Sequence, residues 1–268
     1  MFVWELIVGM GIILIGGIAN TQTNPEHVRS EVFIDRNDKQ GISGKTEIAF
    51  AWGQLFEPPQ DLLHGVINLK EAMNRWTDVA TTLNEHLMLS DPGIMNLPFV
   101  FVTADRVFDL TETEKKNLRA YFENGGFMFL DNCQAASDFS ASGASLRKIL
   151  VDVITNARFA PVPDNHHLYH CFFDFDDGPP QGTEQNIQTW HSNIEGPVPR
   201  PETIVLPPQR LYLEGVWLDD DLVAVYSDKG YVVKWNDSSN NEPQLRMGVN
   251  LIVYALTKHN SIAKQINR

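Results

Sequence analysis

The residues best suited to chemistry are one cysteine and a small group of histidines. Cys133 follows an apolar stretch that ends at Leu130, and His166 and His170 lie in a loop that contains several prolines. A thiol that is deprotonated by a nearby histidine can attack a carbonyl carbon. One hypothesis is therefore a hydrolase in which Cys133 is the nucleophile and His166 or His170 is the base.

The neighbours of Cys133 argue against this hypothesis. A nucleophile on a strained strand-to-helix turn needs small neighbours, but no glycine lies within two residues of Cys133. Asp131 adds a negative charge, which raises the pKa of a thiol. We therefore expect an inert cysteine and no catalytic residue. A disulfide between Cys133 and Cys171 stays open, because an oxidising compartment would permit it.

A metal site is the second possibility for the histidines. His166 and His170 are four residues apart, which would align them on a helix, and Asp174 follows four residues later. The nearby prolines and aromatic residues favour an extended segment instead. The alternatives are a zinc site formed by His166, His170 and Asp174 or a polar loop whose histidines bond to the backbone. We expect the second, with no metal and no cofactor.

The elements that would position these residues alternate between strands and helices. Thr111 and Glu114 form a capping box, and Gly125-Gly126 ends the helix that it begins. The strand–helix–strand unit from Pro98 to Asp131 predicts a right-handed parallel crossover. The other expected elements are strands at 47–52, 97–103 and 127–130, helices at 61–81, 146–151 and 246–256, and a hairpin of 210–218 with 221–226. This pattern predicts an α/β fold with a parallel sheet and helices on both faces.

Several segments resemble an uncharacterised bacterial domain family. They are Leu110–Glu114, Leu118–Phe127, Asp131–Cys133, His166–Phe175, Leu213–Trp217 and Arg246–Asn250. The resemblance covers about residues 46–257. It implies a flavodoxin-like fold of the class I glutamine amidotransferase type, export beyond the cytoplasmic membrane for many members, and no established reaction. A fainter similarity is to an accessory subunit of a bacterial photosynthetic reaction-centre and light-harvesting assembly.

The segment Phe2–Ala19 is apolar except for Glu5. Eighteen helical residues span roughly 27 Å, close to the hydrocarbon thickness of a bilayer. Trp4 suits the membrane interface, and Gly9, Gly16 and Gly17 share one helix face on which another helix can pack. A cleaved signal peptide ending at Gly17-Ile18-Ala19 and a buried core helix are the alternatives. We expect a retained transmembrane anchor over residues 1–19.

The rest of the chain divides by composition. Residues 20–45 are polar and predict a tether with a short strand at Val32–Ile34. Residues 46–257 predict the α/β domain, with a loop-rich insertion at 156–210, and residues 258–268 a C-terminal tail.

Charge limits the partners. The formal net charge of −13 disfavours nucleic acid, because phosphates repel an acidic surface. The basic residues that follow the apolar segment give a weak orientation signal, since large domains cross membranes regardless of such charges. We expect a single-pass protein of the inner (cytoplasmic) membrane with a periplasmic domain. Its expected function is that of a non-enzymatic accessory subunit that docks on an integral membrane protein complex. The alternative is a periplasmic amidotransferase-like hydrolase that uses Cys133 with a histidine.

Overall fold

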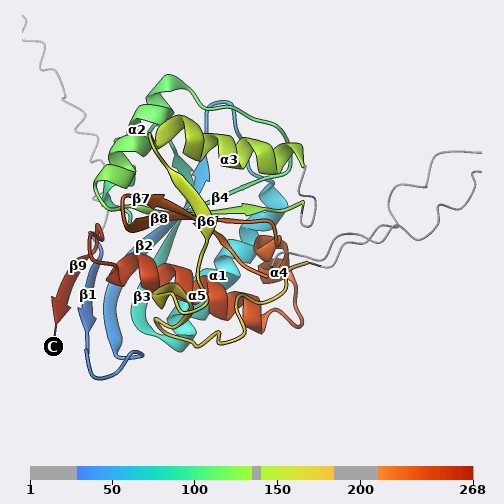
Figure 1. The fold of residues 1–268 in the computed structure, drawn as a ribbon. Coiled ribbons are helices and arrows are strands. Elements are labelled where there is room, and N and C mark those ends of the chain that lie inside the picture. Colours follow the sequence, from blue (N-terminus) through green and yellow to red (C-terminus); the bar gives the residue numbers. More distant parts are fainter. Residues whose placement is uncertain (1–28, 135–139, 184–210, 268) are drawn as a thin grey trace, which may run out of the picture.

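The computed structural model describes residues 29–134, 140–183 and 211–267. These residues form a mixed α/β fold, in which helices cover both faces of a central, largely parallel sheet (Figure 1). The fold class expected from the alternating pattern is thus confirmed at the level of a parallel sheet with helices.

The sheet contains nine strands within the described residues. Its order is β6-β7-β8-β5-β4-β2-β1-β9, and β3 pairs with the other side of β2. The bounds are β1 (Glu31–Ile34), β2 (Ile42–Trp52), β3 (Asp78–Met88), β4 (Phe99–Ala104), β5 (Phe127–Asn132), β6 (Arg158–Pro161), β7 (Glu214–Leu218), β8 (Asp221–Ser227) and β9 (Lys264–Asn267).

Five strands run parallel and lie in the order β3-β2-β4-β5-β8. Counted along the chain, these are the second, first, third, fourth and fifth parallel strands. The strand order therefore reverses between β2 and β4. All five carboxyl ends lie at one edge of the sheet, which we call the carboxyl edge.

Alternating side chains of the parallel strands build two cores. One face presents phenylalanines of β2, β4 and β5 to α1 (Leu63–Trp76), α4 (Tyr231–Asn236) and α5 (Glu242–Thr257). The other face presents aliphatic residues to α2 (Glu112–Glu123) and α3 (Ala141–Val153). The continuous apolar strands follow from burial on both faces, as expected for a parallel sheet. Figure 1 shows α2 and α3 on one side of the sheet and α1, α4 and α5 on the other.

The predicted strand–helix–strand unit is confirmed. β4 and β5 pair in parallel, and α2 connects them. Thr111 and Glu114 form the capping box. Gly125 ends the helix with a φ of 89°, and a Cβ there would lie 1.5 Å from the Asn260 carbonyl oxygen. Only glycine fits this turn without a backbone shift.

The predicted helix over residues 61–81 is too long. It ends at Trp76, and residues 78–88 form the edge strand β3. Thr77 ends the helix, because both its N–H and its hydroxyl bond to the Met73 carbonyl, at 3.0 and 2.8 Å. Asn74 then bonds to both backbone groups of Thr81, at 2.7 and 3.1 Å.

The predicted tether (20–45) and C-terminal tail (258–268) both contain residues that join the sheet, and for those residues the prediction is wrong. The predicted short strand exists as β1, but it pairs with β2 and with β9. Residues 31–45 and 264–267 therefore belong to the domain. An ion pair of 2.9 Å between Lys264 Nζ and Glu31 Oε1 supports the pairing. The sequence predicted β1 but neither its pairing nor β9, because backbone pairing between distant segments leaves little trace in composition.

The predicted anchor, with Trp4, Gly9, Gly16 and Gly17, lies outside the described residues. Within the described ranges, no helix combines the length and apolar character that a membrane crossing requires. The insertion at 156–210 contains β6 and a short 3-10 turn at His167–Tyr169, and its residues 184–210 also lie outside the described ranges. The predicted hairpin is confirmed as β7 and β8.

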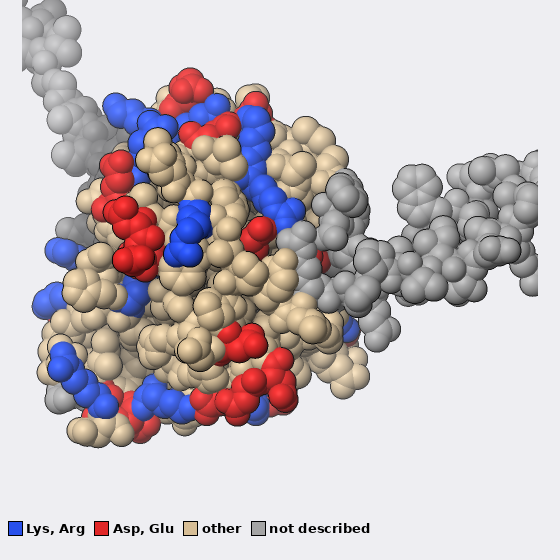
Figure 2. Space-filling view, in the orientation of Figure 1, with Lys and Arg blue, Asp and Glu red and all other residues tan. Residues whose placement is uncertain are grey.

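Charges of both signs are mixed on the face that carries α2, α3 and α5. Figure 2 shows Lys and Arg side chains beside Asp and Glu side chains on this face. This mixture differs from the single-sign basic surface that a nucleic-acid-binding face needs.

Candidate functional site

The crevice between the carboxyl ends of β2 and β4 lies where the strand order reverses. In open α/β sheets, ligands bind outside the carboxyl ends of the strands, where the strand order reverses. Residues 53–56 follow β2 and form a tight turn, in which Gly53 and Phe56 pair as an isolated bridge. Phe56 packs against Phe108, which follows β4, with ring centroids 4.4 Å apart.

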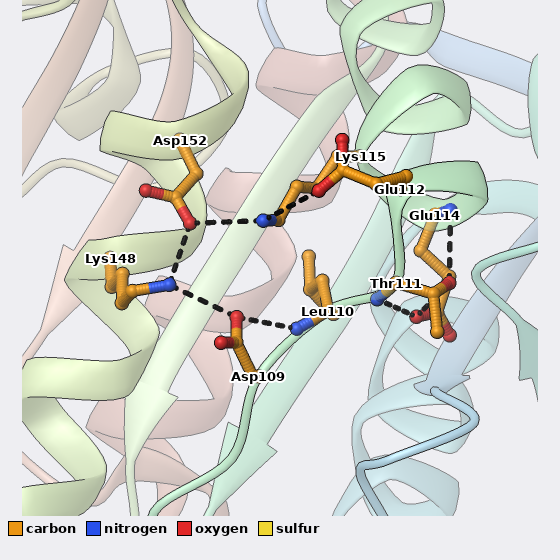
Figure 3. A network of polar contacts seen from close by, with 8 residues as sticks. All are labelled: Asp109, Leu110, Thr111, Glu112, Glu114, Lys115, Lys148 and Asp152. Atoms are coloured by element: carbon orange, nitrogen blue, oxygen red, sulfur yellow. Dashed lines mark hydrogen bonds and ion pairs between the residues drawn. The ribbon is translucent and has the colours of Figure 1, made fainter.

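Glu114 fills this crevice from the first turn of α2. Its side chain is fully buried. Oε1 accepts a hydrogen bond of 2.7 Å from the Gln54 N–H, and Oε2 accepts bonds of 2.7 Å from the N–H and the hydroxyl of Thr111. Figure 3 shows Glu114 facing Thr111 at the start of the helix. A Cβ on Gly53 would lie 3.0 Å from Oε1, so the turn and the carboxylate are in close contact.

The Glu114 carboxylate is therefore an anion that the chain itself places between β2 and β4. A backbone N–H after the first parallel strand, together with a helix N-terminus, is a typical donor set for a bound phosphate. Here the Glu114 carboxylate accepts from both, and its charge repels an anionic ligand. The capping box was visible in the sequence. The bond to Gln54 was not, because it joins residues sixty positions apart.

Cys133 lies just beyond the end of β5 and is half-buried. Its thiol donates to the Ala104 carbonyl oxygen at 3.0 Å. Burial, followed by the charge of Asp131, raises the pKa of the thiol to about 12. Among the described non-glycine residues, positive φ angles occur at Asn156, Asp219 and Asn240, so Cys133 is not on a strained nucleophile turn. The thiol is protonated at neutral pH.

Asp131 is a buried acid at the carboxyl edge with a raised pKa. It is fully buried on β5, and its Oδ2 accepts a bond of 2.8 Å from the Val232 N–H at the start of α4. Its Oδ1 has no hydrogen-bond partner among the described residues. Burial raises the pKa of Asp131 to about 6, against the opposing effect of nearby backbone and Ser227 donors. From the sequence, Asp131 is notable only as a neighbour of Cys133, because an isolated aspartate carries no signal of burial.

The histidine loop (residues 162–178) lies toward the other end of the central strands. The His166 ring packs on Tyr254 with centroids 5.5 Å apart, and Tyr254 packs on Phe127 at 5.3 Å. Phe127 is the first residue of β5, whereas Cys133 follows the last. Six strand residues span roughly 20 Å. The structure therefore does not bring Cys133 and His166 together.

The three predicted metal ligands do not converge either. His170 bonds to Asp174 through Nδ1 at 3.3 Å and to the Asp164 carbonyl through Nε2 at 2.9 Å. Asp174 also forms an ion pair with Lys39. His166 instead uses Nδ1 to accept a bond from the Leu168 N–H at 3.1 Å. No group of three metal-binding side chains occurs in the part of the chain that the structure describes.

Asn250 of α5 fixes the histidine loop. Its amide donates to the carbonyls of Leu168 at 3.0 Å and Phe173 at 2.8 Å, and its oxygen accepts from the Phe173 N–H at 2.8 Å. Cys171 is buried beside it and donates to the Asn250 carbonyl at 3.2 Å. Cys133 and Cys171 are both free thiols, so the disulfide considered from the sequence is not formed.

A family model described as a domain of unknown function (DUF4159) matches residues 59–256. The chain belongs to this family. No curated protein matches it. The expectation of an uncharacterised domain family is thus confirmed.

The DUF4159 match begins just before α1 and ends within α5. It contains Glu114, Asp131, Cys133 and the histidine loop. It leaves out β1, β2 and β9, so the Gln54 donor of the Glu114 contact lies outside the matched residues. The crevice is therefore closed by one residue inside the match and one outside it.

Proposed function

We propose that the chain is a non-enzymatic accessory subunit. In this proposal, residues 2–19 hold it in a membrane, and the α/β domain docks on an integral membrane protein complex. The observation that carries the proposal is the position of the Glu114 carboxylate. It occupies the crevice in which an α/β enzyme would bind a substrate or cofactor, and its hydrogen bonds are satisfied within the chain.

The state of Cys133 supports the same proposal. A nucleophilic thiol needs a lowered pKa or a base within hydrogen-bond reach. The pKa of Cys133 is raised to about 12, and its hydrogen bond goes to a backbone carbonyl. The histidines suggested as its base contact the histidine loop and α5 instead.

A finer description of the fold belongs to this proposal. The order of the parallel strands along the chain, second-first-third-fourth-fifth, is that of flavodoxin-like folds. The class I glutamine amidotransferase-like fold suggested by the sequence resemblance has this architecture. We interpret the domain as this architecture without an activated nucleophile.

The location follows from the proposed anchor. A single-pass subunit of the inner membrane with its domain in the periplasm fits the apolar run Phe2–Ala19 and the resemblance to exported domains. A more specific version makes the partner a bacterial photosynthetic reaction-centre and light-harvesting assembly. This version rests on the sequence resemblance, and it names the complex with which the chain should co-purify.

Native isolation tests the proposal. The chain is purified from its own membranes in mild detergent, and the co-purifying proteins and its N-terminal sequence are identified. We expect a large assembly that contains integral membrane proteins and a chain that retains residues 2–19. A monomer whose sequence starts near Asn20, and which turns over an amide or carbohydrate substrate, would establish the alternative hydrolase.

Thiol reactivity separates the two functions directly. We expect Cys133 of the folded chain to react with iodoacetamide at least a hundredfold more slowly than a free cysteine, because only the thiolate attacks. The unfolded chain is the control and should react at the normal rate. Rapid modification of Cys133 in the folded chain would contradict the inert cysteine on which the proposal relies.

A further inference from the structure

Three exposed apolar side chains gather at the carboxyl edge. Leu55, Met88 and Val107 are among the five exposed large apolar residues in the described ranges. Leu55 is 64% exposed and Val107 is 68% exposed. Leu55 follows β2, Met88 ends β3 and Val107 follows β4, so three neighbouring strands deliver them to one edge. We call these three residues the carboxyl-edge patch.

Contacts between the three segments hold the patch together. Trp52 at the end of β2 pairs with Met88, and the Leu89 N–H donates to the Trp52 carbonyl at 2.7 Å. The turn that carries Leu55 closes through the bridge of Gly53 with Phe56. Phe56 packs on Phe108, next to Val107. A surface fixed in this way loses little conformational entropy when a partner binds.

Acidic side chains surround the patch. Glu57 and Asp105 both raise the pKa of the Arg106 guanidinium, and the hydrogen bond that Arg106 donates to Asp105 is the main cause. Glu85 lies beside Trp52, since the Trp52 indole N–H donates to the Glu85 carbonyl at 3.0 Å. Asp91 follows β3 and is exposed. These five described residues, four carboxylates and one guanidinium, together carry a negative net charge.

We infer that the carboxyl-edge patch binds a segment of a partner protein that presents apolar side chains flanked by Lys or Arg. The inference rests on the proposed docking function and names the surface that carries it. The apolar centre contributes the hydrophobic contact, and the acidic rim selects a basic partner.

The charge of the rim also excludes the other occupants. A second copy of the chain would place the carboxylates around the patch against one another in a two-fold interface, which is unfavourable. Anionic lipid headgroups would meet the same carboxylates. A basic protein segment is the occupant that complements both the apolar residues and the charge.

Two model peptides test the inference with the full chain in detergent. One is an amphipathic helix of leucine and lysine, and the other has glutamate at every lysine position. We expect the lysine peptide to bind at least ten times more tightly than the glutamate peptide. Its affinity should fall as salt rises toward about 0.5 M, where charges are screened within a few ångströms. Equal binding of the two peptides would overturn the inference.

Paired variants locate the binding surface. We expect Leu55→Ser combined with Val107→Ser to weaken binding of the lysine peptide about tenfold, since burial of two apolar side chains is lost. Val151→Ser is the matched control, because Val151 is 62% exposed but lies on α3. Glu57→Gln combined with Glu85→Gln should reduce the salt dependence, while Glu123→Gln at the far end of α2 should not. An equal effect of Val151→Ser would contradict the assignment.

The native assembly separates failure of the inference from failure of the proposed function. If the chain co-purifies with membrane proteins and the Leu55→Ser, Val107→Ser variant remains bound, another surface docks and the inference is wrong. If the unchanged chain is found alone, the proposed function is wrong. Self-association of the chain that the double variant abolishes would identify a second copy as the occupant and overturn the inference. Binding to vesicles of phosphatidylcholine and phosphatidylglycerol that the double variant abolishes would do the same for lipid.

Discussion

At the carboxyl edge of the sheet, the Glu114 carboxylate accepts three short hydrogen bonds from the turn after β2 and from Thr111. At the histidine loop, the Asn250 amide of α5 makes three bonds to Leu168 and Phe173. Each is a fully buried side chain on a helix, and each bonds to backbone groups of a distant segment. One is a charged acceptor and the other is a neutral donor and acceptor.

The difference between the two sites bears on which ligands each end of the sheet can bind. Asn250 donates to C=O groups and accepts from an N–H group, as a neighbouring strand does, and it adds no net charge. Glu114 accepts hydrogen bonds only, and it places a negative charge where the donors converge. The carboxyl edge is thereby closed to anionic ligands, whereas the loop fixed by Asn250 is simply held in place.

The largest effect should come from Glu114→Ala. The substitution removes three charge-assisted bonds and leaves partly buried donors without their carboxylate partner, so we expect a loss of about 4 kcal/mol in the free energy of unfolding. Urea denaturation measures it. Glu112→Ala in the same helical turn is the control, and its exposed side chain should contribute less than about 1 kcal/mol. Similar losses for both variants would mean that Glu114 contributes no more than an ordinary acidic residue in the first turn of α2.

Asn250→Ala should cost somewhat less, about 3 kcal/mol, because the three bonds that it removes are between neutral groups. Asn68→Ala is the matched control. Asn68 makes one bond of 2.9 Å, to the Trp235 carbonyl, and should cost about 1 kcal/mol. A loss for Asn250→Ala no larger than that of the control would show that the loop holds without the amide.

Asp131 gives the carboxyl edge a pH dependence opposite in sign to that of the histidine loop, in which burial lowers the pKa values of His166 and His167. Its folded pKa of about 6 lies above its ordinary value of 3.8, so its contribution to stability is present below about pH 4 and is lost as pH rises through 6. The difference corresponds to roughly 3 kcal/mol at most. We expect Asp131→Asn to raise the free energy of unfolding above pH 6 by about 2 kcal/mol and to change it little near pH 4.

Denaturant unfolding across this pH range checks the prediction. Asp109→Asn is the control, because the Asp109 carboxyl is exposed and its pKa is lowered by the hydrogen bond from Lys148. A stabilisation by Asp131→Asn that does not depend on pH would mean that the carboxyl is not the titrating group.

The smallest effect is expected for the surface network between α2 and α3. Lys148 bonds to Asp109 at 3.0 Å and to Asp152 at 2.7 Å, and Lys115 bonds to Glu112 at 3.1 Å (Figure 3). Exposed ion pairs contribute little, so Lys148→Ala should lower the free energy of unfolding by about 0.5 kcal/mol at low salt. High salt should abolish the difference. A loss as large as that of Asn250→Ala would show that the ion pairs between α2 and α3 are important for stability.

Local patterns predicted the parts of the fold that local forces determine. The capping box at Thr111, the glycine stop at Gly125 and the hairpin of β7 with β8 are confirmed. Each depends on residues that are close in sequence. The strand–helix–strand unit is confirmed for the same reason.

The errors occurred where pairing between distant segments decides the structure. β3 carries Asp, Asn and Glu and follows an amphipathic helix, so its sequence continues the helical spacing. β1 was predicted as a strand but not as part of the sheet, and the short, mostly polar β9 was missed, because β1 pairs with β2 and β9 pairs with β1 across long sequence distances. The bond of Glu114 to Gln54 and the burial of Asp131 also require the assembled sheet. The candidate site was therefore less predictable than the fold.

The Asn74 side chain has a consequence beyond the end of α1. Among the described strands, β3 pairs only with β2, so its outer backbone groups face away from the sheet. At Thr81, Asn74 already bonds to both of these groups. An incoming strand from another molecule would have to displace both bonds, at a cost of about 2 kcal/mol. The exposed edge of β3 thus resists pairing with a strand of another molecule at Thr81, which opposes aggregation into intermolecular β-fibres.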